Sequence, residues 1–339
     1  MREDKMPEQV EPGGTVVAGR KPADWESFAS SFGRIADNIK EVIQGKDQEI
    51  RLALVCLVAE GHLLIEDVPG VGKTMLAKSM ARSIDCSFRR IQFTPDLLPT
   101  DVTGVNVYNQ ERGDFEFKPG AIFANVVLGD EINRASPKTQ SALLESMEEH
   151  QVTVDGVTYH LGAPFMVIAT QNPIEHEGTY PLPEAQLDRF MMRLSIGYPS
   201  AEAEAGILGT HGITSTLDDI GPVMDARGAA EMALQAREVH VAKALQRYIV
   251  ALAEATRSHP DVYLGASPRA SIMLLRASRA MAASDGRDYV IPDDVKSLVI
   301  PVLAHRLIVS ADAAMSGRTP TALLAQLQQE IPVPVPDRA

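Results

Sequence analysis

The stretch Gly70-Val71-Gly72-Lys73-Thr74 combines residue types that bind phosphate groups. Its two glycines let backbone N–H groups turn toward phosphate oxygens, Lys73 brings a positive charge, and Thr74 offers a hydroxyl group to Mg²⁺. The strict phosphate-loop pattern begins with a further glycine, and this chain has Asp67 at that position. That first glycine mainly eases the turn out of the preceding strand, so the positions that contact phosphate are intact.

A phosphate loop needs a strand that leads into it and a helix that leaves it. The short apolar run His62–Glu66 predicts the strand, and residues Thr74–Ile84 predict the helix, whose N-terminus adds partial positive charge. The earlier residues Val42, Ile43 and Gly45 either contact adenine or form a plain turn before a helix. We assign the nucleotide contacts to Val68, Pro69, Gly70, Val71, Gly72, Lys73, Thr74, Met75 and Asp130.

Two more polar segments follow predicted strands. The apolar strand Val126–Leu128 leads to Asp130, which would hold Mg²⁺ together with Thr74, and to Glu131, which would polarise the attacking water. Asn172 follows the buried strand Phe165–Thr170 and could orient that water. Each signal is common in isolation, but their order behind a phosphate loop predicts an ATP site.

Two arginines complete the candidate catalytic set. Arg189, in the sequence Leu-Asp-Arg-Phe, could act as an arginine finger supplied to a neighbouring subunit. Arg269 lies in the first turn of a helix that Ser267-Pro268 begins, although a helix N-terminus disfavours positive charge. A nearby phosphate would explain it, so we expect ATP to bind between the catalytic domain and a following lid.

The predicted fold class is α/β: a P-loop core with a parallel sheet, followed by an all-helical lid. Apolar strands alternate with helices in the core, as in sheets covered on both faces, whereas only helices are predicted from Val239 onward. The core contains an irregular insertion with some β character over residues 94–123, and a hairpin over Gln151–Leu161 that turns at Asp155-Gly156. We predict a disordered tail at 1–23, the core at 24–199, a connector at 200–238, the lid at 239–328 and a tail at 329–339.

Composition narrows the functional classes. The chain has 339 residues and a net charge of −13, with no run of Lys or Arg, which argues against nucleic-acid binding. Its two cysteines, Cys56 and Cys86, suit a reducing compartment. We see neither a secretory signal nor an apolar stretch of about 20 residues, so the sequence predicts a cytoplasmic protein without an integral membrane segment.

The ordered motifs EDVPGVGKT, GDEINRASPKTQSALLESMEE, ATQNP, YPLPEAQLDRF and GASPRA resemble those of the MoxR family of AAA+ ATPases. This resemblance covers roughly residues 35 to 310. It implies a Walker A loop at Gly70–Thr74, Walker B acids at Asp130 and Glu131, sensor 1 at Asn172, an arginine finger at Arg189 and sensor 2 at Arg269. It also implies the helix-2 insert and the hairpin that magnesium-chelatase subunits share.

The resemblance further implies a homo-oligomeric, hexameric ring with ATP and Mg²⁺ at the subunit interfaces. Such rings remodel or mature partner complexes, including by cofactor insertion, and many work with a von Willebrand factor A (VWA) domain protein; the client here is unknown. Two alternatives stay open: an ATP-dependent binding switch with little turnover, and a magnesium-chelatase-type motor subunit. A switch has no need for Glu131, Asn172 and Arg189 together, so their joint presence favours an enzyme.

Overall fold

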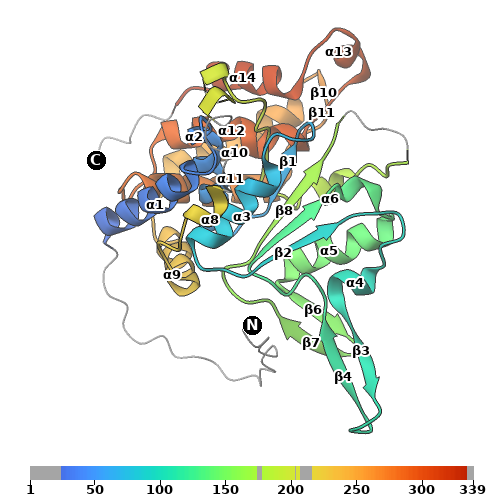
Figure 1. The fold of residues 1–339 in the computed structure, drawn as a ribbon. Coiled ribbons are helices and arrows are strands. Elements are labelled where there is room, and N and C mark those ends of the chain that lie inside the picture. Colours follow the sequence, from blue (N-terminus) through green and yellow to red (C-terminus); the bar gives the residue numbers. More distant parts are fainter. Residues whose placement is uncertain (1–23, 174–177, 203, 207–215, 334–339) are drawn as a thin grey trace.

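The computed structural model describes residues 24–173, 178–202, 204–206 and 216–333 (Figure 1). The predicted tail at 1–23 and residues 334–339 of the predicted C-terminal tail lie outside the described residues. The helices are α1 (Trp25–Lys40), α2 (Asp47–Val58), α3 (Lys73–Ser83), α4 (Pro99–Thr103), η1 (Ile132–Arg134), α5 (Pro137–Glu149), α6 (Glu184–Leu187), α8 (Thr216–Asp219), α9 (Ala226–Ala236), α10 (Lys243–Ser258), α11 (Pro268–Ser284), α12 (Pro292–Leu303), η2 (Ala304–Arg306), α13 (Ala311–Met315) and α14 (Pro320–Glu330).

A five-stranded sheet forms the centre of the first domain. Its strand order is β2-β5-β8-β1-β9, and every pair of neighbours is parallel. The predicted parallel sheet is therefore confirmed. Its strands are β1 (Leu63–Glu66), β2 (Phe88–Gln92), β5 (Val126–Asp130), β8 (Met166–Gln171) and β9 (Met192–Leu194).

Side chains alternate between the two faces of this sheet, and both faces are buried. Leu63 and Ile65 pack into the core that contains α1, α2, α3 and the lid helices, whereas Leu64 packs into a second core with α5. This explains why the strands read as continuous apolar runs. The lid thus shares one hydrophobic core with one face of the sheet.

Serine caps begin the helices that carry or follow functional residues. The Ser136 side chain accepts a hydrogen bond from the amide of Thr139 at 3.4 Å, and α5 starts at Pro137. Likewise, the Ser267 hydroxyl accepts one from the amide of Ala270 at 3.1 Å before α11. Both predicted caps are confirmed.

Two hairpins project from one side of the core, side by side in Figure 1. The insertion at 94–123 is more regular than predicted: it contains α4 and a six-pair antiparallel hairpin of β3 (Gly104–Asn109) and β4 (Asp114–Pro119). Cross-strand pairing outside the main sheet supplies this regularity. The predicted second hairpin is confirmed as β6 (Gln151–Val154) and β7 (Val157–His160), with positive φ at Asp155 and Gly156.

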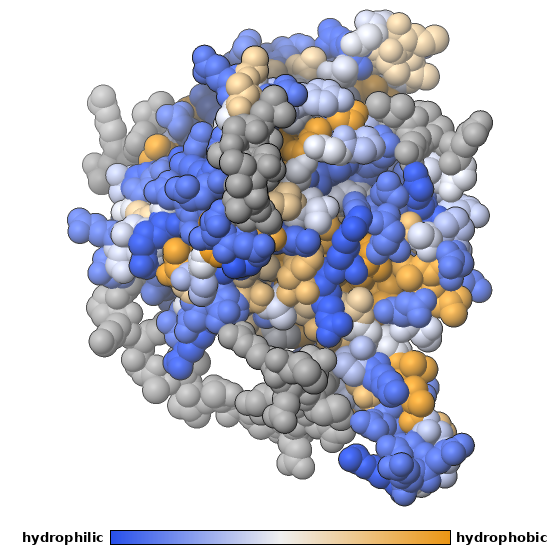
Figure 2. Space-filling view, viewed as in Figure 1, coloured by the Kyte–Doolittle hydropathy of each residue, from blue (hydrophilic) through white to orange (hydrophobic). Residues whose placement is uncertain are grey.

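An aromatic cluster joins the hairpins. The Phe117 ring stacks on that of Tyr159 with 4.0 Å between ring centroids, and the Asn106 amide donates to Asp155 at 2.8 Å. Farther out, Tyr108 and Phe115 pair edge to face and are 52% and 71% exposed. Figure 2 shows this projecting end as a lobe with hydrophobic and hydrophilic surface side by side.

The C-terminal part is helical, with one addition to the prediction. Two short strands, β10 (Val262–Leu264) and β11 (Ile308–Val309), pair antiparallel within the lid. The predicted connector also contains a regular helix, α9, which buries Met232 against the core. Among the described residues, no helix is long and apolar enough to cross a membrane.

Candidate functional site

The phosphate loop connects β1 to α3, as the sequence predicts. Gly70 and Gly72 have φ values of +86° and +94°, a backbone conformation that side chains other than glycine rarely adopt. A Cβ atom added at Gly70 would meet nothing within 4 Å, so the space beside the loop is open. Lys73 is the first residue of α3, which places the helix N-terminus at the loop.

Asp67 has a larger structural role than the sequence suggested. It is buried, and its carboxylate accepts hydrogen bonds from the Ser195 hydroxyl at 3.0 Å and from the amides of Gly197 at 2.6 Å and Val68 at 2.8 Å. Burial would raise the pKa of Asp67, but these hydrogen bonds together hold it below its usual value. Its carbonyl oxygen also accepts from the Lys73 amine at 2.6 Å. Asp67 therefore ties the loop to the segment after β9.

A cavity of about 190 Å³ lies beside the loop. Val42 and Ile43 line it, which fits the predicted adenine contact, while Gly45 forms the adjacent turn with φ +70°. The whole lining consists of Val42, Ile43, Gln44, Lys46, Gly70, Val71, Gly72, Met75, Gly197 and Pro199. Within the described part of the chain, this wall comes from the turn after α1, the phosphate loop, Met75 of α3 and the segment after β9. Binding of ATP between the core and the lid stays a prediction.

The acidic pair lies where β5 ends, beside the loop. The Thr170 hydroxyl links the two acids, because it donates to Asp130 Oδ1 at 2.6 Å and accepts from the Glu131 amide at 2.9 Å. Arg90 on β2 forms an ion pair with Asp130 Oδ2, and the Gln92 amide donates to Glu131 Oε2 at 2.9 Å. Glu131 itself has φ +57°, an uncommon value for a side chain of this size, and this conformation turns the backbone sharply after the strand.

The strand register brings Asn172 to the same edge. β8 lies between β1 and β5, with Glu66 opposite Gln171, so Asn172 follows directly beside the loop and is 7% exposed. Burial lowers the pKa of the half-buried Lys73 amine, and the negative charges of Asp67, Asp130 and Glu131 oppose that shift. The lysine and the acids are thus close enough to interact electrostatically.

These residues are suited to bind Mg²⁺ and a nucleoside triphosphate. No group of three or more His, Cys, Asp or Glu side chains is arranged to hold a metal in the described ranges. Magnesium usually takes only one or two protein ligands and completes its shell with water and substrate phosphates, which a pair such as Thr74 and Asp130 satisfies. Arg90 donates twice to Asp130 Oδ2, whereas Oδ1 accepts one hydrogen bond from Thr170 and keeps a lone pair for such binding.

The predicted arginines lie at the other end of the sheet. Arg189 stands just before β9, whose first residue pairs with Leu63 at the start of β1. Its guanidinium contacts Glu148 Oε2 at 3.2 Å, and the Arg269 guanidinium contacts Glu148 Oε1 at 3.0 Å. We call these two residues the arginine pair. The loop follows the carboxyl end of β1, about 13 Å away along four residues of strand.

Buried contacts fix this amino end. His62 precedes β1; its Nε2–H donates to the Met147 carbonyl at 2.9 Å, and its Nδ1 accepts from the Val167 amide at 3.0 Å. Burial lowers the pKa of His62 to about 3, so the ring is neutral. Since Met147 precedes Glu148, His62 holds the end of α5 against the sheet.

Sequence reasoning missed several partners of the predicted residues: Thr170, Arg90, Gln92 and Glu148. Thr170 lies inside the ATQNP motif and was within reach of the sequence. The others come from separate elements and carry no local signal.

Fold and site together define an AAA+ ATPase: a phosphate loop and an Asp-Glu pair at the carboxyl edge of a five-stranded parallel sheet, followed by a helical lid. Residues 62–192 match the "ATPase family associated with various cellular activities (AAA)", and residues 254–327 match the AAA lid domain.

Within this class, the chain belongs to the MoxR family, as its motifs indicated. It is 43% identical over 305 residues to Chaperone MoxR1 of Mycobacterium tuberculosis, a match that covers 87% of this chain and 80% of that protein. It is 48% identical over 310 residues to the "Uncharacterized protein YeaC" of Bacillus subtilis, covering 91% and 97% respectively. The chain is also similar to a Cytophaga hutchinsonii protein whose crystal structure is described as that of a "putative ATPase". The two are 37% identical with a TM-score of 0.86, over 92% of this chain and 97% of that chain.

Proposed function

We propose that this chain binds and hydrolyses Mg²⁺·ATP in a ring of identical copies, a hexamer as is common among AAA+ proteins. The observation that carries the proposal is the location of the loop and the arginine pair at opposite ends of one sheet. A head-to-tail contact would bring the arginine pair of one copy to the loop of the next, and repeated contacts of this kind close into rings.

In the proposed site, the loop amides and Lys73 bind the phosphates, and Thr74 and Asp130 hold the metal. Mg²⁺ held by Thr74 and Asp130 would neutralise part of the phosphate charge. Val42 and Ile43 pack against the base in the adjoining cavity. The Asp67 hydrogen bonds keep the loop in position.

Glu131 would accept a proton from the attacking water, and Asn172 would orient that water toward the γ-phosphate. Gln92 and Arg134 contact the same oxygen of the Glu131 carboxylate, Oε2, at 2.9 and 3.2 Å, so Oε1 could accept the proton without breaking either contact. Arg189 and Arg269 of the neighbouring copy would stabilise the charge of the transition state.

The client is a protein complex that the ring remodels or matures, and a VWA-domain protein is the expected partner of the ring. Support comes from a relative named a chaperone and from the two hairpins, whose exposed Tyr108 and Phe115 offer an apolar contact surface. The proposed location remains the cytoplasm, and we propose no nucleic-acid partner, given the acidic charge. The proposed domain boundaries are those predicted above.

Subunit mixing tests the shared site. Lys73→Ala leaves the arginine pair intact but removes a phosphate contact, whereas Arg189→Ala does the reverse. Each variant alone should be nearly inactive, and a random one-to-one mixture should regain up to about one quarter of wild-type turnover, because a quarter of the interfaces then combine an intact loop with an intact arginine. A mixture that stays inactive, although mixed rings form, would refute catalysis across the subunit interface.

A nucleotide-trap pull-down tests the client. Glu131→Gln should bind ATP without hydrolysing it, with Lys73→Ala as the control that does not bind ATP, and captured proteins would be identified by mass spectrometry. Partners that appear only with the trap and ATP support remodelling. The binding switch would be favoured if the wild type showed no turnover and captured the same partners as Glu131→Gln. The magnesium-chelatase-type motor would be favoured if subunits of that type were among the partners.

A further inference from the structure

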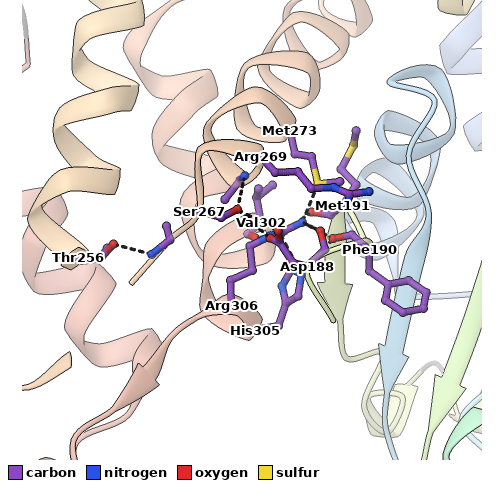
Figure 3. Close-up of polar contacts among 12 residues, drawn as sticks. Asp188, Phe190, Met191, Thr256, Ser267, Arg269, Met273, Val302, His305 and Arg306 are labelled. Carbon is purple, nitrogen blue, oxygen red and sulfur yellow. Dashed lines mark hydrogen bonds and ion pairs between the residues drawn. The ribbon is translucent and has the colours of Figure 1, made fainter. Parts of the chain in front are cut away.

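Arg306 is a charged residue buried at the junction of the lid and the catalytic domain. It is the last residue of η2, and its side chain is 2% exposed. Figure 3 shows its polar contacts. Burial lowers the pKa of Arg306 to about 10, while Asp188 opposes the shift, so the guanidinium stays charged at neutral pH. Burying a charge is unfavourable unless it is paired and hydrogen-bonded, so its partners show what it does.

Four of the seven hydrogen bonds of the Arg306 side chain within the described residues go to residues 188–191, the segment that contains Arg189, and the other three go to Val302, His305 and Met273. The Arg306 guanidinium forms an ion pair with Asp188 Oδ1 at 2.7 Å and donates to the carbonyls of Asp188 at 3.1 Å, Phe190, and Met191 at 3.3 Å. One planar, five-donor group therefore holds the backbone on both sides of Arg189. Lysine has no such fork and could not make all these contacts.

Asp188 extends the connection to Arg269. Its two carboxylate oxygens lie 3.1 and 3.0 Å from the Ser267 hydroxyl, which also caps α11 two residues before Arg269. The chain Arg306–Asp188–Ser267 thus links the backbone beside Arg189 to the first turn of the helix that carries Arg269. By contrast, Glu148 contacts the arginine pair from a side chain that is 40% exposed.

We propose that Arg306 is a positioning residue that aligns Arg189 and Arg269 for the ATP of the neighbouring copy. This inference rests on the proposed function. Arg306 is tied to the amino end of the sheet and to the lid, away from its own phosphate loop. Its loss should therefore impair catalysis at the neighbouring site and leave ATP binding at its own site unchanged.

The test uses Arg306→Lys and Ser267→Ala in the full-length protein. Arg306→Lys should lower turnover by about 10²-fold through misplacement of the arginine pair, with unchanged affinity for a fluorescent ATP analogue. Mixed with Lys73→Ala, it should recover up to about one quarter of wild-type turnover, because Lys73→Ala supplies an aligned pair. Mixed with the Lys73→Ala/Arg189→Ala double variant, it should stay inactive.

Matched controls separate positioning from general damage to the lid. Arg318→Lys alters an ion pair to Asp261 elsewhere in the lid, and Thr319→Ala removes the cap of α14; both should retain wild-type turnover. Ser267→Ala should lower turnover less than Arg306→Lys and be rescued in the same mixture. If Arg306→Lys does not fold, Ser267→Ala decides the question.

The inference would be overturned if Arg306→Lys, or Ser267→Ala where Arg306→Lys does not fold, kept wild-type turnover or lost ATP binding at its own site. It would also be overturned if Lys73→Ala failed to rescue that variant where it rescues Arg189→Ala. If Lys73→Ala rescues neither, the interface site proposed above is refuted instead, so the two failures are distinguishable.

Discussion

The two ends of the central sheet are built in different ways. At the carboxyl end, the loop, the acidic pair and Asn172 each follow directly from a strand, and parallel pairing alone brings them together. At the amino end, Glu148, Arg189, Arg269 and Arg306 come from four separate segments and are connected by side-chain contacts, those of Arg306 being with Asp188 and the backbone beside Arg189. The carboxyl end is thus set by sheet register, and the amino end by packing of the lid.

This difference bears on how the protein would work. Groups attached to strand ends in one sheet cannot move far relative to one another, which suits the binding of metal and phosphate. Groups held jointly by the lid and the core can shift when the lid shifts, which suits a contact that responds to the neighbour's nucleotide. The predictions below test whether a substitution at one end of the sheet leaves the function of the other end unchanged.

The largest effect is expected for Arg189→Ala. Turnover should fall by about 10³–10⁵-fold, as for other arginine fingers, while ATP affinity stays at the wild-type level. Steady-state hydrolysis and titration with a fluorescent nucleotide measure the two quantities. A parallel loss of ATP affinity would mean that the ends are not separable.

Acidification should destabilise the amino end through His62. His62 is neutral when folded, with a pKa of about 3, whereas the unfolded chain takes up a proton near pH 6.5. Its stabilisation is present at neutral pH and is lost as the pH falls from about 6.5 toward 3. Between pH 7 and 4.5 the loss from this residue should be about 2–3 kcal/mol.

Chemical denaturation of the wild type and of His62→Gln at both pH values measures this effect. The variant should show the smaller drop in unfolding free energy, and His160→Gln, at an exposed position, should behave as the wild type does. Equal drops in His62→Gln and the wild type would show that His62 does not titrate as described.

Asp67→Gly restores the usual first glycine of a phosphate loop but removes three hydrogen bonds to a buried carboxylate. Unfolding free energy should fall by about 1–3 kcal/mol, and ATP affinity should weaken with it. Thermal unfolding with and without ATP measures both. An unchanged melting temperature would show that the loop does not depend on Asp67.

The smallest effect is expected for Glu148→Ala. Partly exposed ion pairs contribute about 0–1 kcal/mol each, so turnover should change by less than about fivefold. A hydrolysis assay beside Arg306→Lys compares the exposed contact with the buried one. A larger loss in Glu148→Ala than in Arg306→Lys would mean that Glu148, and not Arg306, aligns the arginine pair.

Local patterns predicted much of the fold and one end of the site. The caps Ser136 and Ser267 and the turn at Asp155-Gly156 were correct because neighbouring residues determine them. The hairpin β3–β4 was underestimated and β9 was not predicted, because pairing with distant segments stabilises them. A three-residue strand is too short for periodicity to reveal.

The sequence by itself predicted the phosphate loop, the acidic pair and Asn172, because each is a contiguous motif next to its own strand. The order of these and further motifs along the chain indicated the family. Only the tertiary structure decided that Arg269 joins Arg189 at Glu148, away from the loop of the same chain, and that Arg306 is buried against Asp188. The physical reason is that contacts between elements depend on how helices pack on the sheet. No local spacing encodes that packing.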